Sequence, residues 1–430
     1  MPPRLPGASC LLLLAVLHLG FAGERPPLLN RIRLQMTDNL ARLPNYTCLQ
    51  TIERMTRKPE SRRFAFVDMV RLEVALVNGN ELFSWPGAGK FEDIEIGDLV
   101  SGGAIGNGNF ALHARSVFLS SAPEFRYLGL LNRGDTPLHA WSYRVDVRHS
   151  GYTLRVGQME AIVGYHGTFW ADPNTLDLVR LEVQADDIPG RLQLSAAGDA
   201  IEYQRVPIGG ETFLLPRSSE MELVSALNHG ASTNRTRFSS CRQYTGESVL
   251  SFTDPELNPA VAIPPPVEWF ELPKGTPLEV SLETPIGFGT SAVGDPITAI
   301  LRRDVKARGQ KHGAALAAKG ALLHGRITML RSQALAQSDA YVVALHFFEL
   351  ESGNKRAKLS ARLEDVSVAQ STISLSPLSR LSAGLRKQYP LPRLSLGVQG
   401  SVLFVVRESV KLPRGLRMVW RTELLPEDKS

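Results

Sequence analysis

Histidine, cysteine and serine are the residues from which a catalytic or metal-binding site would be built, and their spacing in this chain does not favour one. The chain has nine histidines, and none falls in the H-x-H or H-E-x-x-H spacing of a zinc site. The Gly-x-Ser-x-Gly motif of serine hydrolases does not occur. We therefore predict a protein that is not an enzyme and that binds neither a metal nor another cofactor. A hydrolase assembled from residues distant in the sequence is the alternative.

Two further segments resemble ligand-binding loops without matching them. The glycine-rich segment 102–108 precedes a helical pattern, as a phosphate-binding loop does, but it lacks a Walker lysine and a βαβ setting. We predict that it is a hinge between helices. The acidic residues Glu92, Asp93, Glu95 and Asp98 lack the spacing of a calcium loop, so we predict that they begin a helix.

The N-terminus has the features of a signal peptide. Arg4 precedes the apolar run Cys10–Leu19, and the small residues that follow end at Ala22. We expect residues 1–23 to be removed and the mature chain to be periplasmic or secreted. Lipidation of Cys10 is the alternative, although this cysteine begins the apolar run and a lipidated cysteine should follow it. No later segment has the roughly 18 uninterrupted apolar residues of a spanning helix, so we expect a soluble protein.

Two cysteines, Cys48 and Cys241, remain after removal of the signal peptide. An even pair in an oxidising compartment predicts a disulfide bond, and two free buried thiols are the alternative. The bond would close a long loop, and loop-closure entropy gives it an upper-end stabilisation of about 5 kcal/mol. It would join the first strand of the N-terminal domain to the last.

Length and charge suggest two domains with different surfaces. A chain of 430 residues exceeds the usual size of a single core. Acidic residues outnumber basic ones from Glu24 to Pro266, whereas basic residues outnumber acidic ones from Val267 to Ser430. The basic half is suited to peripheral contact with an anionic surface, and a solvated basic face is the alternative. Export and the scarcity of aromatic residues beside the charges argue against nucleic-acid binding.

The elements that must position these residues are mainly strands. Val70, Leu72, Val74 and Leu76 alternate with residues that face the other way, and the turn at Asn78–Asn80 leads into a second run. Similar patterns recur as far as Phe252. We predict one large curved antiparallel sheet, or half-barrel, with an apolar face that has to be covered.

Two helical patterns are available to cover that face. Apolar residues recur at three- and four-residue spacing over Pro26–Leu43 and again over Phe110–Phe118. A helix inserted into a sheet domain has to pack its apolar stripe on the sheet. We therefore predict an N-terminal helix and inserted lid helices on one face of the half-barrel.

This organisation, together with the segment Gly167–Thr175 (G-T-F-W-A-D-P-N-T), resembles the periplasmic lipoprotein-carrier (Lol-type) family. The resemblance covers about Glu24–Phe252. It implies an incomplete β-barrel whose concave apolar face is covered by helices and receives acyl chains. The disulfide and the glycine-rich insertion are not part of the simple carrier pattern.

A proline-rich linker is predicted at 253–273, because Pro255, Pro259 and Pro264–Pro266 cannot donate ladder hydrogen bonds. The remaining segment, 274–430, alternates as strands do, with a long loop expected at Ser367–Ser395. From Gly275 to Arg326 it resembles the small β-barrel of type IV secretion channel-core proteins. The predicted fold class is thus mainly β (α+β): a half-barrel domain at 24–252 and a smaller β-barrel-like domain.

The function that we infer from the sequence is binding without catalysis. The N-terminal domain would hold a hydrophobic or lipid-like ligand, or a lipidated partner, between sheet and helices. The alternative is a structural or regulatory module of the cell envelope that binds a partner protein, the layout of periplasmic stress-sensor regulators. Candidate ligand contacts, each of which is alternatively plain core, are the aromatic residues Phe83, Trp85, Phe110, Phe118, Trp141, Phe169 and Trp170.

Overall fold

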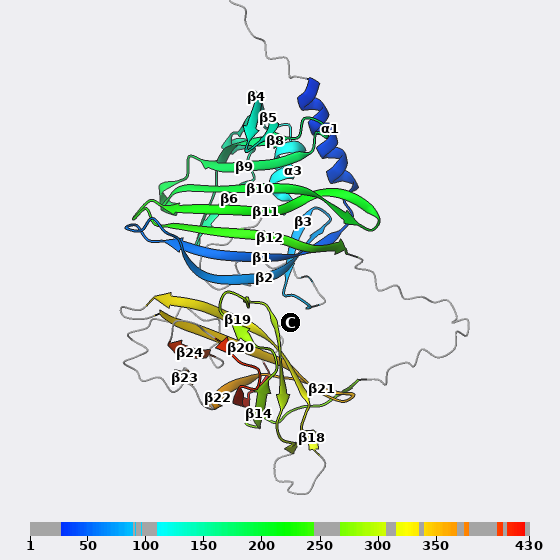
Figure 1. Cartoon of the computed structure of the whole chain (residues 1–430), viewed down its shortest axis with the longest axis vertical. Helices are drawn as coiled ribbons and strands as arrows, with labels where there is room; N and C mark the ends of the chain where they lie inside the picture. The colour runs from blue at the N-terminus through cyan, green and yellow to red at the C-terminus, as the bar shows by residue number, and fades with distance from the viewer. Residues whose placement is uncertain are drawn as a thin grey trace, which may run out of the picture.

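The computed structural model of the chain describes residues 27–88, 91, 96, 110–244, 267–306, 315–334, 339–367, 374–377, 402–406 and 411–425. The predicted signal peptide, the glycine-rich segment, residues 253–266 of the linker and most of the predicted loop after Ser367 lie outside these residues. The described part is mainly β, with two ten-stranded sheets (Figure 1). Within it, no helix has the length and apolar character needed to cross a membrane.

The first sheet is antiparallel and brings the two ends of its chain segment together. The order of its strands is β3-β2-β1-β12-β11-β10-β9-β8-β5-β4, so the first strand pairs with the last. The bounds are β1 (Tyr46–Arg57), β2 (Ala65–Val77), β3 (Asn80–Ser84), β4 (Glu124–Arg133), β5 (Thr136–Val145), β8 (Gly164–Ala171), β9 (Leu178–Asp186), β10 (Leu194–Ile208), β11 (Glu211–Ser225) and β12 (Ala231–Gln243). A separate hairpin is formed by β6 (Thr153–Val156) and β7 (Met159–Ile162), and two short 3-10 helices are η1 (Val147–His149) and η2 (Gly190–Leu192).

The register places one continuous row of side chains on the same face of this sheet. Each member lies directly opposite the next across neighbouring strands: Val70, Ile52, Thr236, Ser219, Ile201, Leu181, Phe169, Trp141 and Tyr127. All are buried except Tyr127, which is 42% exposed at the end of the row. We call the face that carries this row the inner face. Its burial follows from the alternation of apolar residues along each strand.

Two helices cover the half of the inner face that is nearest β4. Helix α1 (Pro27–Arg42) packs Leu29, Ile32 and Met36 against the sheet, and α3 (Leu112–Phe118) adds Val117 and Phe118 to the same cluster. In Figure 1, α1 lies along one side of the sheet and α3 lies over it. The predicted helix at Pro26–Leu43 is thus present, while the second helix begins two residues later than its pattern.

The second sheet is built around the order β13-β21-β20-β19-β16-β14-β26-β22, with β23 and β24 joined to β20. Its described ladder does not close into a barrel, because β13 and β22 stand at its two ends. The bounds are β13 (Glu268–Trp269), β14 (Pro277–Leu282), β16 (Pro296–Leu301), β19 (Leu322–Ala334), β20 (Asp339–Ser352), β21 (Lys355–Lys358), β22 (Ala361–Ser367), β23 (Ser374–Pro377), β24 (Val402–Val406) and β26 (Arg417–Thr422). Two small pairs complete it, β15 (Ile286–Gly287) with β25 (Lys411–Leu412) and β17 (Val305–Lys306) with β18 (Ala315–Ala317).

The two sheets share one hydrophobic core. Ile52, Val70 and Leu72 of the first sheet belong to the same buried cluster as Val293 and Val343 of the second. Val70 and Val293 form a parallel bridge, in which the N–H of Val293 donates to the Met69 carbonyl at 2.8 Å and the N–H of Arg71 donates to the Val293 carbonyl at 2.7 Å. The bridge lies within the part of β2 that β3 leaves unpaired, and it covers that sheet edge at Val70.

A disulfide bond joins Cys48 of β1 to Cys241 of β12, across a sequence separation of 193 residues. The two strands are neighbours in the sheet, and their register shifts between Thr47 and Leu49, beside the bond. The bond therefore connects the first strand of the sheet to the last.

Candidate functional site

Most of the aromatic residues predicted to contact a ligand form closely packed core. Trp141 and Phe169 have no exposed surface, Phe118 is 1% exposed, and the Trp141 and Phe169 rings stack with centroids 5.2 Å apart. Phe83 and Phe110 belong to the core shared by the two sheets. On the inner face, the sheet's own side chains and those of α1 and α3 therefore occupy the space between sheet and helices.

The other two predicted residues lie elsewhere. Trp85 packs at the junction of the two sheets, where the guanidinium of Arg326 lies 5.3 Å from the centre of its ring. Trp170 projects from the opposite face of β8 to Phe169, and Arg133 and Arg180 lie over its ring at 5.8 and 6.0 Å. The structure thus does not gather the predicted residues into one site, and neither pocket described below is lined by Trp141 or Phe169.

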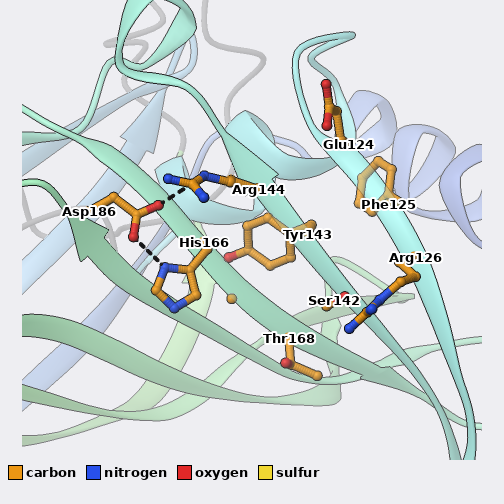
Figure 2. Close-up of a pocket in the computed structure, with 10 residues that line it drawn as sticks. Glu124, Phe125, Arg126, Ser142, Tyr143, Arg144, His166, Thr168 and Asp186 are labelled. Atoms are coloured by element: carbon orange, nitrogen blue, oxygen red, sulfur yellow. Dashed lines mark hydrogen bonds and ion pairs between the residues drawn. The ribbon is translucent and has the colours of Figure 1, made fainter.

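A pocket of about 520 Å³ lies at the β4 end of the first sheet, across β4, β5, β8 and β9 (Figure 2). We call it the edge pocket. The residues that line it are Glu124, Phe125, Arg126, Ser142, Tyr143, Arg144, His166, Gly167, Thr168 and Asp186. None of these residues could be recognised from the sequence as a functional group, because they come from four strands and form no local motif.

Strand register explains why the polar residues gather there. Arg126 lies opposite Ser142, and Ser142 lies opposite Thr168, so these three form one row. Arg144 and His166 form the next row. Each alternates along its strand with an inner-face residue, which directs these side chains to the other face.

The strongest polar contact in the edge pocket is between His166 and Asp186. The Nδ1 atom of His166 lies 2.7 Å from Oδ1 of Asp186, and the other carboxylate oxygen lies 3.4 Å from Nε of Arg144. In the described part of the chain, the His166 imidazole hydrogen-bonds to Asp186 alone. A histidine oriented by a carboxylate is half of a catalytic triad, but no hydroxyl group of a described residue is bonded to its other nitrogen. This arrangement is suited to binding a polar group.

The floor of the edge pocket contains an irregularity in the β8–β9 ladder. Pairs are formed at His166 and at Phe169, but not at Gly167 or Thr168 between them. Instead, the hydroxyl of Tyr143 on β5 donates to the Glu182 carbonyl of β9 at 2.6 Å. Burial, with a smaller effect of neighbouring tyrosines and Glu182, raises the pKa of Tyr143 well above its usual value. The hydroxyl is therefore a permanent donor at neutral pH.

Strand β4 borders the edge pocket and forms one edge of the first sheet. It pairs with β5 on one side, and no described residue pairs with its other edge. Large apolar side chains are exposed along it: Tyr127 42%, Leu128 36%, Leu130 53% and Leu131 42%. Leu130 lies opposite His139 and Leu131 opposite Leu138, so these side chains project on both faces.

Strand β4 was not predicted from the sequence. Its residues, E-F-R-Y-L-G-L-L-N-R, are exposed or half-buried throughout, and polar and apolar residues alternate only as far as Tyr127. A bulge between Tyr127 and Gly129 shifts the pattern further. The available signal was the apolar run Tyr127–Leu131 followed by a turn at Gly134, whose φ is +60°.

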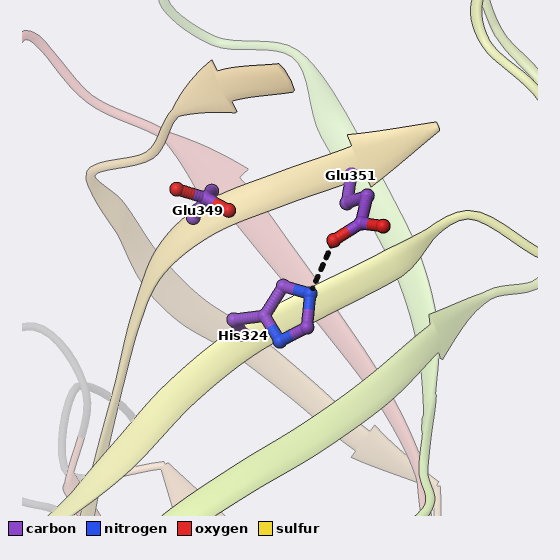
Figure 3. Close-up of side chains that lie close together, drawn as sticks. All are labelled: His324, Glu349 and Glu351. Carbon is purple, nitrogen blue, oxygen red and sulfur yellow. Dashed lines mark hydrogen bonds and ion pairs between the residues drawn. The ribbon is translucent and has the colours of Figure 1, made fainter. Parts of the chain in front are cut away.

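A second cluster of ionisable groups lies on β19 and β20 of the second sheet (Figure 3). His324, Glu349 and Glu351 place one ligand atom each within 4.8 Å of one another. Nε2 of His324 lies 3.0 Å from Glu351, while Arg356 contacts Glu349 at 3.2 Å and Glu351 at 3.5 Å. Arg356 thus already supplies the positive charge between the two carboxylates.

No protein-family model and no curated protein matches the chain. Among solved structures, it is similar to a domain from Vibrio parahaemolyticus described as an outer membrane lipoprotein-sorting protein, with 11% identity, a TM-score of 0.28, and coverage of 51% of this chain and 93% of that chain. A DUF1329 family protein from Desulfovibrio piger is also similar, with 10% identity, a TM-score of 0.28, and coverage of 51% of this chain and 92% of that chain. ComB10 of the Com type IV secretion system of Helicobacter pylori is similar with 12% identity, a TM-score of 0.20, and coverage of 36% of this chain and 92% of that chain.

A lipoprotein-sorting protein and a type IV secretion protein are thus both among the solved structures similar to this chain.

Proposed function

We propose that this chain is an exported, non-enzymatic protein of the cell envelope that binds an extended segment of a partner protein along the free edge of β4. One observation carries the proposal. The inner face, where a ligand was predicted, is filled by side chains, whereas β4 presents exposed apolar residues and a strand edge that pairs with no described strand. The disulfide supports export, because such bonds persist in oxidising compartments.

The physics of strand edges supports this choice. An edge strand presents a row of unpaired N–H and C=O groups, which can form a ladder with an added strand. The added main-chain hydrogen bonds supply affinity, and side chains at alternate positions supply specificity. Here the inner-face row ends in Tyr127, whose ring lies 4.8 Å from that of Trp141. An added strand would extend this row by one residue and cover Tyr127.

The surroundings of β4 indicate the chemistry of the partner segment. Tyr127 and Leu130 offer apolar contacts to one face of an added strand, and Leu131 to the other. Arg126 of β4 faces the edge pocket, which has room for a side chain. We expect a segment with apolar residues at alternate positions and one polar side chain that reaches the edge pocket.

The proposal can be tested with peptides selected from a random display library on the immobilised mature chain. Selected peptides would be synthesised and titrated against the parent protein, Leu130→Lys and Ile162→Lys. A lysine on the edge disfavours strand addition, so Leu130→Lys should weaken binding at least about tenfold. Ile162 is 55% exposed, close to the 53% of Leu130, but lies on the β6–β7 hairpin. Its substitution by lysine should leave binding unchanged.

Amide hydrogen exchange locates the binding site independently of the substitutions. The bound peptide should slow exchange at β4 and leave exchange at β6 and β7 unchanged. Failure to select any peptide, or equal binding to the parent and Leu130→Lys, would contradict the proposal.

The second candidate function, a lipid-like ligand beneath α3, is favoured by one specific observation. His113 of this helix places its Nε2 atom 3.5 Å from Oδ2 of Asp199 without forming a hydrogen bond, and the buried atoms Asp199 Oδ1 and Trp141 Nε1 have no hydrogen-bond partner among the described residues. Buried polar atoms without partners destabilise the closed arrangement. Helix α3 has only 7 residues and no side-chain N-cap. An acyl chain would enter if α3 moved away from the sheet.

A fluorescent fatty acid distinguishes the two candidates. Uptake with a defined stoichiometry, competed by unlabelled fatty acid and abolished by Ala114→Trp on the buried face of α3, would support the lipid-like ligand. Leu130→Lys should not alter that uptake. Absence of uptake by delipidated protein would rule this candidate out and leave the proposal for β4 untouched.

Peripheral contact of the basic region after Val267 with an anionic surface belongs to the same proposal of an envelope role, and vesicle sedimentation with anionic lipid tests it.

A further inference from the structure

A smaller pocket of about 250 Å³ lies where the two sheets meet. We call it the junction pocket. The first sheet contributes residues from β1, β2 and β12, and the second sheet contributes one residue from β19: the lining residues are Arg54, Met55, Thr56, Val67, Ser232, Asn234 and Arg331. The pocket therefore exists only while the sheets are docked.

Positive charge exceeds negative charge around the junction pocket, because two arginines contact one aspartate. Asp68 is 2% exposed, and its carboxylate accepts two hydrogen bonds from Arg54, one from Nε at 2.6 Å and one from Nη2 at 2.5 Å. Nε of Arg331 reaches the same carboxylate only at 3.4 Å. The Asp68 carboxylate is therefore already paired with Arg54, and Arg331 is a second, more distant guanidinium beside it. The two terminal nitrogens of Arg331 have no partner among the described residues. No acidic side chain is among the residues that line the pocket.

Arg331 is held in place by its neighbours. The next residue, Ser332, donates its hydroxyl to the Phe66 carbonyl of β2 at 3.0 Å. The guanidinium is only partly exposed, with 19% of the Arg331 side chain accessible. A largely desolvated, weakly paired and positioned arginine is the kind of group that binds an oxyanion through two parallel N–H donors.

We propose that the junction pocket binds a small oxyanion, a carboxylate or phosphate group, through the terminal nitrogens of Arg331. Thr56 and Ser232, which lie opposite each other on the same face as Arg54, supply hydroxyl donors, and Val67 supplies an apolar contact for a short chain attached to the anion. The pocket is smaller than those of drug-sized ligands, so the ligand is small. Because the anion would contact both sheets, its binding stabilises their docking.

The test measures thermal stability and calorimetric binding of the full mature chain with inorganic phosphate and with butyrate, each against chloride at equal ionic strength. The parent should gain stability and bind at least one of the two anions in a saturable manner. A stronger response to phosphate identifies that group, a stronger response to butyrate identifies a carboxylate with an apolar chain, and equal responses identify the shared oxyanion. No response beyond that of chloride overturns the proposal.

Two arginines at the junction form a matched pair of variants. Arg71→Gln removes the ion pair between Arg71 and Asp295, which also joins the sheets but does not line the pocket. It should lower stability and keep the anion response. Arg331→Gln should weaken anion affinity about tenfold to a hundredfold, as expected for a lost hydrogen bond to a charged group. Arg331→Lys, which keeps the charge and lacks the fork, should retain only part of the affinity. Equal anion affinity in the parent and Arg331→Gln would overturn the assignment.

Discussion

The hydroxyl of Tyr143 donates to the carbonyl of Glu182 across Gly167, at 2.6 Å. This contact joins β5 to β9 across β8, the strand that lies between them. It is possible only because residue 167 has no side chain. A Cβ atom there would lie 1.8 Å from the Glu182 oxygen and 2.7 Å from the Tyr143 hydroxyl.

Gly167→Ala is therefore expected to be strongly destabilising. The added methyl group would have to displace the Glu182 backbone and break the hydrogen bond, for a loss of about 3 kcal/mol. Urea unfolding measures the change. Gly151→Ala is the control, because nothing lies within 4 Å of a Cβ at that position. Equal stability of the two variants would show that the strands at Gly167 adapt freely.

Removal of the disulfide should destabilise the first sheet. The bond closes a loop with a sequence separation of 193, and loop-closure entropy sets an upper-end loss of about 5 kcal/mol. We expect Cys48→Ala and the double variant Cys48→Ala with Cys241→Ala to lose similar amounts in urea unfolding, since either change removes the bond. Unchanged stability of the parent on complete reduction would contradict the prediction.

The buried pair Arg54 and Asp68 should depend on both partners. Its side chains are 5% and 3% exposed, so removing one partner leaves a buried charge. Arg54→Met should cost about 3 to 5 kcal/mol. Adding Asp68→Leu removes that charge, so the double variant should recover part of the loss. A double-mutant cycle by urea unfolding measures the coupling, and additive losses would show that the two groups act independently.

Stability should fall at high pH because of buried tyrosines. Burial, followed by the nearby charge of Glu81, raises the pKa of Tyr46 well above its usual value. In the unfolded chain, tyrosine ionises near pH 10, so above that pH the folded state binds more protons than the unfolded state. The stability that Tyr46 contributes is thus complete below about pH 10 and decreases above it.

Tyr46→Phe tests this pH dependence directly. The Tyr46 hydroxyl has no hydrogen-bond partner among the described residues, so the variant should be about as stable as the parent at pH 7 and lose less stability between pH 9 and 11. Phe110→Leu is the control, because Phe110 contacts the Tyr46 ring at 4.9 Å without being ionisable. It should keep the parent's slope of stability against pH. An unchanged slope in Tyr46→Phe would contradict the assignment.

Arg356→Ala should convert the His324 cluster into a metal site. Without the guanidinium, Glu349 and Glu351 would repel each other, and an imidazole with two carboxylates can ligate zinc. We expect zinc to raise the melting temperature of Arg356→Ala and not that of the parent. His324→Ala added to Arg356→Ala should abolish the effect. Equal stabilisation of the parent by zinc would show that Arg356 does not block the cluster.

Strands and helices with one buried face could be predicted from the sequence because burial imposes a period on the residues. Val70, Leu72 and Val74 alternate since each faces the core, and Asn78 and Gly79 adopt positive φ in the hairpin that follows. Helix α1 shows the spacing of its buried stripe in the same way. Strand β4 could not be predicted in this way, because neither of its faces is buried along most of its length and burial therefore imposes no period on its residues.

The sequence by itself determined the fold class and the alternation that defines an inner face, and it predicted the disulfide that the structure places between β1 and β12. Only the tertiary structure decided what covers that face, because the covering residues come from helices and from a second sheet far away in the chain. Packing, and not periodicity, fills the space around Trp141 and Phe169. Pairing across strands brings His166 to Asp186, and docking of the sheets brings Arg331 to Asp68.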